Sequence, residues 1–293
     1  LAPVVGVPMP MLSYGGSGMM TTSDAHVSTS GRNAHGGYAS GEGSVLNVDN
    51  STFVVSGAGS NGLNADAKST LNASNSQIDV AGSGSGVIAN DSGTVLSLSD
   101  SRINIGRNGG YAALSYNNAT INLKNVDITT DAGNAALSSG FSANIDAENV
   151  FVQARSGGYG LEVQDGSTFS GNNITIDKTG SDAEGFNAAI NVVGLVNPDL
   201  LTSVYLTDSN ITVTGDNATG IVSKQQATLA DIKLANTRIN ATDGTAVNVL
   251  TCTSMNIDAD NSLLSGSMLL KTGYSTTAGA TAALPAPDAS RAE

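Results

Sequence analysis

A six-residue segment recurs along this chain at a nearly constant spacing, and this repeat restricts the possible folds more than any other feature of the sequence. Each copy reads apolar, variable, usually Asn or Asp, small, variable, apolar, as in Ala-Ser-Asn-Ser-Gln-Ile at 73–78. The copies begin 25 positions apart at 48–53, 73–78, 98–103 and 123–128, and continue at 147–152, 169–174, 206–211, 234–239 and 259–264. Repeats of this length are typical of solenoids, in which each coil packs on the next.

Each repeat also predicts three short strands. Alternation of polar and β-branched residues follows the repeated segment, as in Ile-Asn-Ile at 103–105, and is typical of a half-buried strand. A Gly followed by small or apolar residues, as at 110–113, marks a second strand, and a run such as Thr-Val-Leu at 94–96 marks the third. We therefore expect an all-β chain folded as a right-handed parallel β-helix, with about nine to ten coils over residues 45–272.

The composition agrees with a narrow, regular interior. Gly accounts for 35 of the 293 residues, aromatic residues make up 4% and Trp is absent, so Ala, Val, Ile and Leu must fill the core. The period is lacking at both ends of the chain. We expect residues 1–44 to form an irregular N-terminal segment or cap, and residues 273–293, which are rich in Thr, Ala and Pro, to form a flexible tail.

Charge and cysteine content exclude some partners. The net charge is −13 at pH 7, and binding of nucleic acid needs concentrated positive charge, so a nucleic-acid partner is not expected. The single cysteine, Cys252, has no second thiol for an intramolecular disulfide and no nearby His for a metal site. We interpret Cys252 as a small buried apolar residue, and we expect neither a metal nor a cofactor.

An Asn or Asp stands three residues before the last apolar residue of most copies. Asn and Asp adopt left-handed backbone angles at low cost, which predicts a turn at this place in every coil, with side chains stacked as a hydrogen-bonded ladder. Gly171 takes the place in one copy, as the same backbone requirement allows. The alternative is a row of ligands for calcium or sugar. The expected ladder residues are Asn50, Asn75, Asp100, Asn125, Asn149, Asp208, Asn236 and Asn261.

One interval in the repeat is longer than the others, and inserted loops are a common place for function. Between Ile174 and Ile211 lie 37 positions, which predicts either a loop that leaves the rod within 178–203 or one coil with a half-formed extra one. From this interval we select Asn187, Asn197 and Asp199 as candidate binding residues. A second candidate is an outward-facing charged pair on adjacent coils, Arg102 and Asp127.

Catalytic chemistry has weak support in the sequence. Cleavage of polysaccharide needs either two carboxyl groups at a defined separation or a carboxylate and calcium cluster with a cationic base. Asp146 with Glu148, and Asp258 with Asp260, are two residues apart and would project from the same face of a strand. Such pairs are common on acidic surfaces, so we expect no catalytic residues and no enzyme. A polysaccharide-degrading or polysaccharide-binding β-helix is the alternative function.

The repeat also resembles a known family. In the Asn-Ser-x-Ile-x-Val pattern at 75–80, and in the related segment at 208–213 followed by Gly220 and Ile221, the chain resembles the passenger domains of bacterial type V autotransporters, of the pertactin-like and self-associating adhesin group. The resemblance covers about residues 44–272. It implies export to the cell surface, adhesion, aggregation or biofilm formation, and a partner that is a second copy, a host protein or a glycan. It also implies anchoring in the outer membrane through a C-terminal β-barrel, whose many alternating strands do not occur in these residues.

Overall fold

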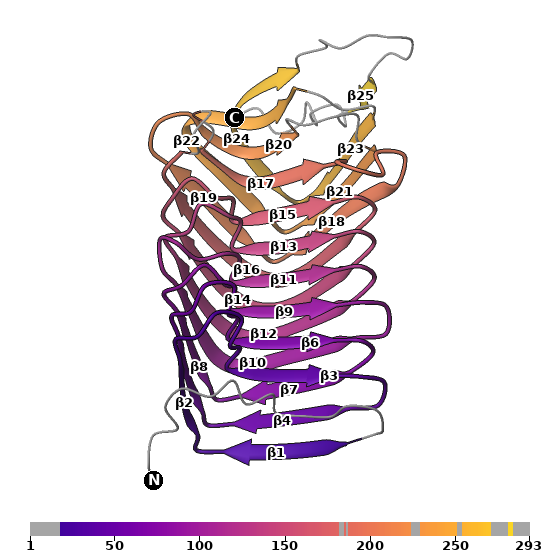
Figure 1. Ribbon diagram of the computed structural model, residues 1–293. Coiled ribbons are helices and arrows are strands. Elements are labelled where there is room, and N and C mark those ends of the chain that lie inside the picture. Colours follow the sequence, from indigo (N-terminus) through magenta and orange to yellow (C-terminus); the bar gives the residue numbers. More distant parts are fainter. Residues whose placement is uncertain are drawn as a thin grey trace.

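The computed structural model describes residues 18–181, 185, 187–223, 229–250, 254–270 and 281–283. These residues form an all-β, right-handed parallel β-helix of about ten turns (Figure 1). The 25 strands of the described residues belong to one continuous sheet, and the strands between the first and last coils pair in parallel with strands of the coils before and after them. The described residues contain no helix that is long and apolar enough to span a membrane.

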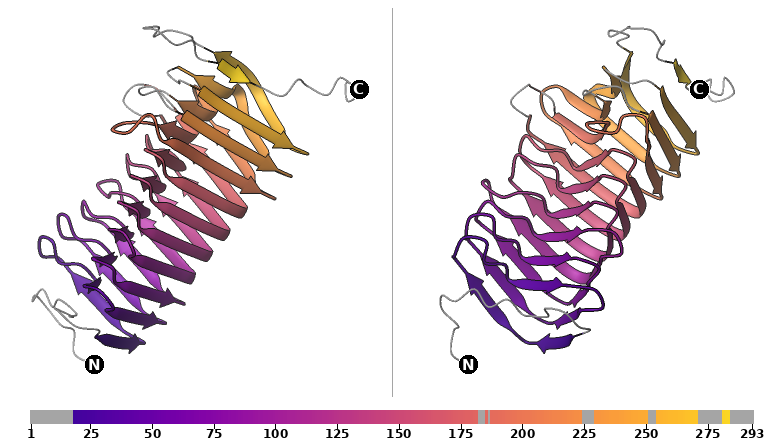
Figure 2. Two further views of the ribbon diagram at one scale, coloured as in Figure 1. Left: turned by 90° about the vertical axis from the view of Figure 1, so that its right-hand side faces the viewer. Right: turned by 45° about the vertical axis from the view of Figure 1, so that its right-hand side comes forward.

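Each coil contributes strands to three faces of the rod, which both views of Figure 2 show as stacks of parallel arrows. The first face consists of β1 (Met19–Ser23), β4 (Val45–Asp49), β7 (Thr70–Ser74), the first parts of β10 (Val95–Ile105), β12 (Thr120–Thr130), β14 (Asn144–Ala154) and β16 (Thr168–Thr179), β18 (Leu201–Thr207), β21 (Leu229–Ala235), β23 (Ser254–Asp260) and β25 (Thr281–Ala283).

The second and third faces complete each coil. The second face consists of β2 (His26–Thr29), β5 (Thr52–Val55), β8 (Gln77–Val80), the last parts of β10, β12, β14 and β16, β19 (Asn210–Thr214), and the first parts of β22 (Arg238–Val249) and β24 (Leu263–Leu270). The third face consists of β3 (Gly37–Ser40), β6 (Leu63–Asp66), β9 (Val87–Asn90), β11 (Ala113–Tyr116), β13 (Leu137–Gly140), β15 (Leu161–Gln164), β17 (Asn187–Val193), β20 (Ala218–Ser223) and the last parts of β22 and β24.

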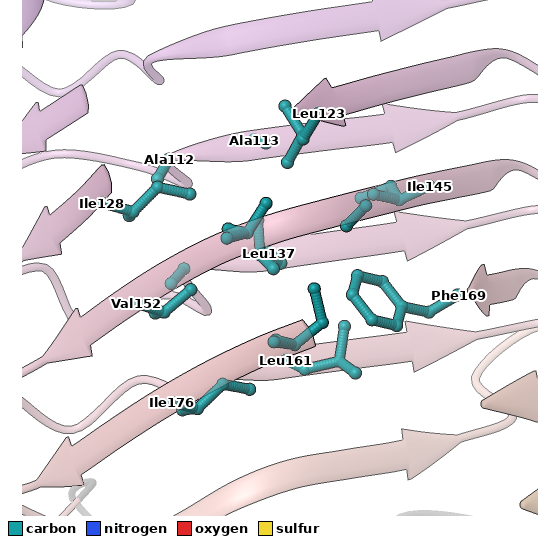
Figure 3. Close-up of a cluster of buried hydrophobic side chains, with 14 of the residues drawn as sticks. Ala112, Ala113, Leu123, Ile128, Leu137, Ile145, Val152, Leu161, Phe169 and Ile176 are labelled. Carbon is teal, nitrogen blue, oxygen red and sulfur yellow. The ribbon is translucent and has the colours of Figure 1, made fainter. Parts of the chain in front are cut away.

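The core is a stack of aliphatic side chains. Because side chains alternate along a strand, every second residue points into the coil and meets its equivalent one coil away. Ile128, Val152 and Ile176 form one such column and are 0% exposed (Figure 3). Burial of each of these side chains contributes roughly 1.5–3 kcal/mol. The scarcity of aromatic residues thus follows from the narrow interior.

The first coil begins earlier than the repeat predicted. β1, β2 and β3 pair in register with β4, β5 and β6, so residues from 19 onward belong to the β-helix and the expected boundary at residue 45 is too late. The apolar pattern fails here because Thr22 occupies the inward place that Val48 fills one coil later. Residues 1–17 lie outside the described part, as do residues 273–293 apart from β25.

The long interval contains a strand of the third face, with extra residues before and after it. β17 pairs in register with β15 and with β20, with Ile190 opposite both Leu161 and Ile221. The middle of the expected loop is therefore a core strand, β17, which lies between β15 and β20 in the stack of Figure 1. The additional residues precede and follow β17 in the sequence, and residues 194–200 form the turn that follows it.

Candidate functional site

The Asn and Asp ladder follows the corner between the first and second faces. All eight expected residues have positive φ, from 45° at Asn50 to 55° at Asn149. Four side-chain amides donate to the ladder residue one coil earlier: Asn125 to Asp100 (2.8 Å), Asn149 to Asn125 (2.9 Å), Asn236 to Asp208 (3.0 Å) and Asn261 to Asn236 (2.7 Å). Asn75 donates instead to Asp49, the residue before Asn50 (2.8 Å). The corner is held by hydrogen bonds that repeat from coil to coil.

One ladder position predicted from the repeat is wrong. Gly171 pairs with Ala147, and the ladder residue of this coil is Asn173, which has a φ of 56° and donates to Asn149 at 2.8 Å. The copy was misplaced by two residues because Gly171 stands where other copies have an apolar side chain. A Cβ at Gly171 would lie 2.8 Å from Cε1 of Phe169, whose ring fills the space that a larger residue would occupy.

Buried hydroxyl groups run behind the ladder. Ser76 Oγ accepts from the backbone N–H of Ser51 at 3.1 Å, and Ser101 Oγ accepts from that of Ser76 at 2.9 Å. Each of these hydroxyls donates to the carbonyl two residues earlier, as Ser76 does to Ser74 at 2.6 Å. These polar groups are used within the fold, so the geometry favours a structural role over a row of ligands.

Arg102 and Asp127 meet on the second face, beside the ladder. Their strands are in register, and Arg102 Nη2 lies 3.5 Å from Asp127 Oδ2. Both side chains are about 60% exposed (61% and 59%). Exposed pairs of this kind contribute about 0–1 kcal/mol, so the pair adds little to stability and remains accessible to a partner.

The three candidates from the long interval are separated by the fold. Asn187 is 0% exposed, accepts from Lys178 Nζ at 3.3 Å and donates to the Thr214 carbonyl at 2.8 Å. It cannot contact a partner, so its selection as a binding residue was wrong. It is buried in β17, which pairs with β20 of the next coil. Asn197 and Asp199 are exposed in the turn at 194–200.

A buried carboxylate holds the turn at 194–200. Asp165 Oδ1 accepts backbone N–H groups from Leu195, Val196 and Asn197 at 2.8, 2.9 and 2.9 Å. Asp165 itself is buried at the end of the third face. With its backbone fixed in this way, the turn presents large apolar side chains to solvent, among them Val196 at 63% exposure.

The first face carries an open groove of about 610 Å³ that crosses β10, β12, β14, β16 and β18. We call it the first-face groove. It has two rows of outward side chains, one of Ser97, Asn122, Asp146, Ser170 and Tyr205, the other of Ser99, Lys124, Glu148, Asn172 and Thr207. The misplaced copy at 169–174 hid this site, because only the correct register puts Ser170 beside Tyr205.

Two polar clusters bound the first-face groove. On one side, Lys124 Nζ lies 3.0 Å from Glu148 Oε2. On the other, the Tyr205 hydroxyl lies 3.4 Å from Asp231 Oδ2, and Lys233 Nζ lies 5.2 Å from the centre of the Tyr205 ring. The hydrogen bond and negative charge of Asp231 raise the pKa of Lys233, which therefore stays cationic over the ring.

The carboxylate pairs lie on the first face. Asp146 and Glu148 are exposed on β14, and Asp258 on β23 is exposed as well. Within the described ranges, no three His, Cys, Asp or Glu side chains are placed to share a metal ion. The expected burial of Cys252 cannot be compared with the structure, because Cys252 lies outside those ranges.

Comparison with known proteins adds no relative: no protein-family model, no curated protein and no solved structure matches this chain.

Proposed function

We propose that this chain is a surface-displayed bacterial adhesin of the autotransporter-passenger type. On this proposal it is a binding protein and not an enzyme, and it contacts its partner through the sides of the rod. Its partner on this proposal is a second copy on a neighbouring cell, or a protein or glycan of a host surface. The observation that carries the proposal is the first-face groove, in which exposed amide, hydroxyl and carboxylate groups recur on successive coils. Many weak contacts of this kind, on many displayed rods, add up by avidity.

The experiment displays the chain on cells that do not otherwise clump. We expect these cells to settle faster and to attach to host matrix more than cells without the chain. The control displays the Ile128→Asp variant, because a carboxylate in the core column should prevent stacking of the coils. If cells that display the chain, with display confirmed by antibody, settle and attach no more than cells without it, the chain is not an adhesin. Release of reducing ends from an added polysaccharide would instead support the enzymatic alternative.

A further inference from the structure

We propose that the first-face groove is a saccharide-binding site, in which a neutral oligosaccharide lies along the rod and stacks one sugar ring on Tyr205. This inference rests on the proposed adhesive function and names the chemical class of its partner.

The surroundings of Tyr205 give its ring one free face. Tyr205 pairs with Ser170 on the coil before and with Lys233 on the coil after. Lys233 Nζ lies over the ring, 5.2 Å from its centre, and the Tyr205 hydroxyl donates to Asp231 Oδ2 at 3.4 Å. Tyr205 and Ser170 line the same groove, and the small Ser170 side chain leaves space beside the ring. A fixed aromatic face beside open space suits the apolar face of a sugar ring.

Polar groups for the sugar hydroxyls stand further along the first-face groove. The Asp146 side chain is exposed and makes no hydrogen bond or ion pair to another described residue, and the Asn172 amide is exposed on the next coil. Outward groups recur about every 4.8 Å along the rod. The advance of one ring in an extended polysaccharide is of similar size, so successive rings can meet successive coils.

The charge of the first-face groove selects among saccharides. Its lining contains one cation, Lys124, and two carboxylates, Asp146 and Glu148, and Lys124 is already paired with Glu148. The chain as a whole carries a charge of −13. A sulfated or uronic-acid polymer would be repelled, and a neutral chain would not.

The test titrates the purified chain with neutral hexasaccharides of the glucan, chitin, mannan and galactan types and with a heparin hexasaccharide. Binding is measured by NMR or calorimetry. We expect at least one neutral probe to bind and the heparin fragment not to bind. Tyr205→Ala should weaken binding about three- to tenfold, and Tyr205→Phe, which keeps the ring, should bind as the parent does. Tyr116→Ala, which removes a half-buried tyrosine from the third face, is the matched control and should have no effect.

A blocking variant covers the case in which Tyr205→Ala does not fold. Ser170→Tyr leaves Tyr205 in place but fills the space in front of it, and it should abolish binding while the circular dichroism stays that of the parent. Absence of binding by every neutral probe, preferential binding of the heparin fragment, or full binding by the folded Ser170→Tyr variant would each overturn the inference.

The same variants separate this inference from the adhesin proposal. If cells displaying Ser170→Tyr aggregate and attach like the parent, the adhesive function stands and the first-face groove is not its site. If the purified chain binds a neutral probe but displayed cells neither settle nor attach, the saccharide site stands and the adhesive function fails.

Discussion

The ammonium group of Lys178 lies 3.3 Å from the side-chain oxygen of Asn187, and both side chains are buried, at 1% and 0% exposure. Lys178 occupies an inward place of β16, between Ala154 and Val213 of the adjacent coils. Its ammonium also donates to the carbonyls of Ser156 at 2.7 Å and Thr179 at 2.8 Å, and to that of Gly180. A cation inside the coil is thus surrounded by oxygen atoms of its own coil and of the coil before it.

Lys178→Met should destabilise the rod by about 2–4 kcal/mol. Methionine fills a similar volume but leaves the carbonyls without their donor, and unpaired buried acceptors are costly. Lys124→Met is the control, because Lys124 is an exposed lysine whose ion pair contributes about 0–1 kcal/mol. Urea unfolding followed by circular dichroism measures both. Equal midpoints for the two variants would show that the buried ammonium is not needed.

Substitutions of Asn149 should separate the two roles of the ladder. Asn149 has a φ of 55°, donates to Asn125 and accepts from Asn173. Asn149→Gly removes the hydrogen bonds but tolerates the backbone angle, whereas Asn149→Ala also carries a left-handed penalty of about 1–2 kcal/mol. We expect the unfolding midpoint to fall in the order parent, Gly variant, Ala variant. A Gly variant no more stable than the Ala variant would leave only the hydrogen bonds as the reason for Asn.

The pair Phe169 and Gly171 should be energetically coupled. A Cβ at Gly171 would lie 2.8 Å from Cε1 of Phe169 and 2.6 Å from Cγ1 of Ile174. Gly171→Ala should therefore cost about 1–3 kcal/mol by overpacking. The cost should be smaller in a Phe169→Leu background, where the aromatic edge is gone. A double-mutant cycle from thermal unfolding measures the coupling, and strict additivity would contradict the proposed contact.

His35 should make stability depend on pH. Its Nδ1 accepts the backbone N–H of Asn61 at 3.0 Å, and burial lowers its pKa below the ordinary 6.5, against an opposing effect of Asp66. The unfolded chain takes up the proton first, so this contribution to stability is complete above pH 6.5 and is lost as the pH falls from 6.5 through the lower folded-state pKa.

The histidine prediction has a matched control. His35→Gln should flatten the fall in thermal midpoint just below pH 6.5 relative to the parent. His26→Gln, at an exposed position of β2, should leave the pH profile unchanged. Identical profiles for the parent and His35→Gln would assign the pH dependence to other groups.

Asp165 should control the order of the turn at 194–200. Asp165→Ala removes the acceptor of three backbone N–H groups, so hydrogen exchange at residues 195, 196 and 197 should speed up at least tenfold. Asp127→Ala, at an exposed position on the second face, should leave exchange in this turn unchanged. Exchange rates at 195–197 that are the same in Asp165→Ala and the parent would mean that other contacts hold the turn.

The repeat alone predicted the β-helix, because one apolar residue per coil must meet its equivalent on the next and Asn suits the turn before it. It failed where a coil lacks that signature: Thr22 hid the first coil, and Gly171 shifted one copy by two residues. Spacing also cannot distinguish a projecting loop from a core strand with extra residues on either side, so buried Asn187 was taken for an exposed residue. The first-face groove is lined by side chains from successive coils. It can be predicted only when the register that places these side chains next to one another is known.

The stacking of coils also determines how the rod responds to pulling. Each coil contacts chiefly the coils before and after it, with β10, β12, β14 and β16 paired in succession. Force applied to the two ends therefore peels coils from an end instead of breaking the whole core at once. Each released coil of about 25 residues lengthens the tether by roughly 80–90 Å. A chain that holds two surfaces together can thus yield stepwise under load and remain connected.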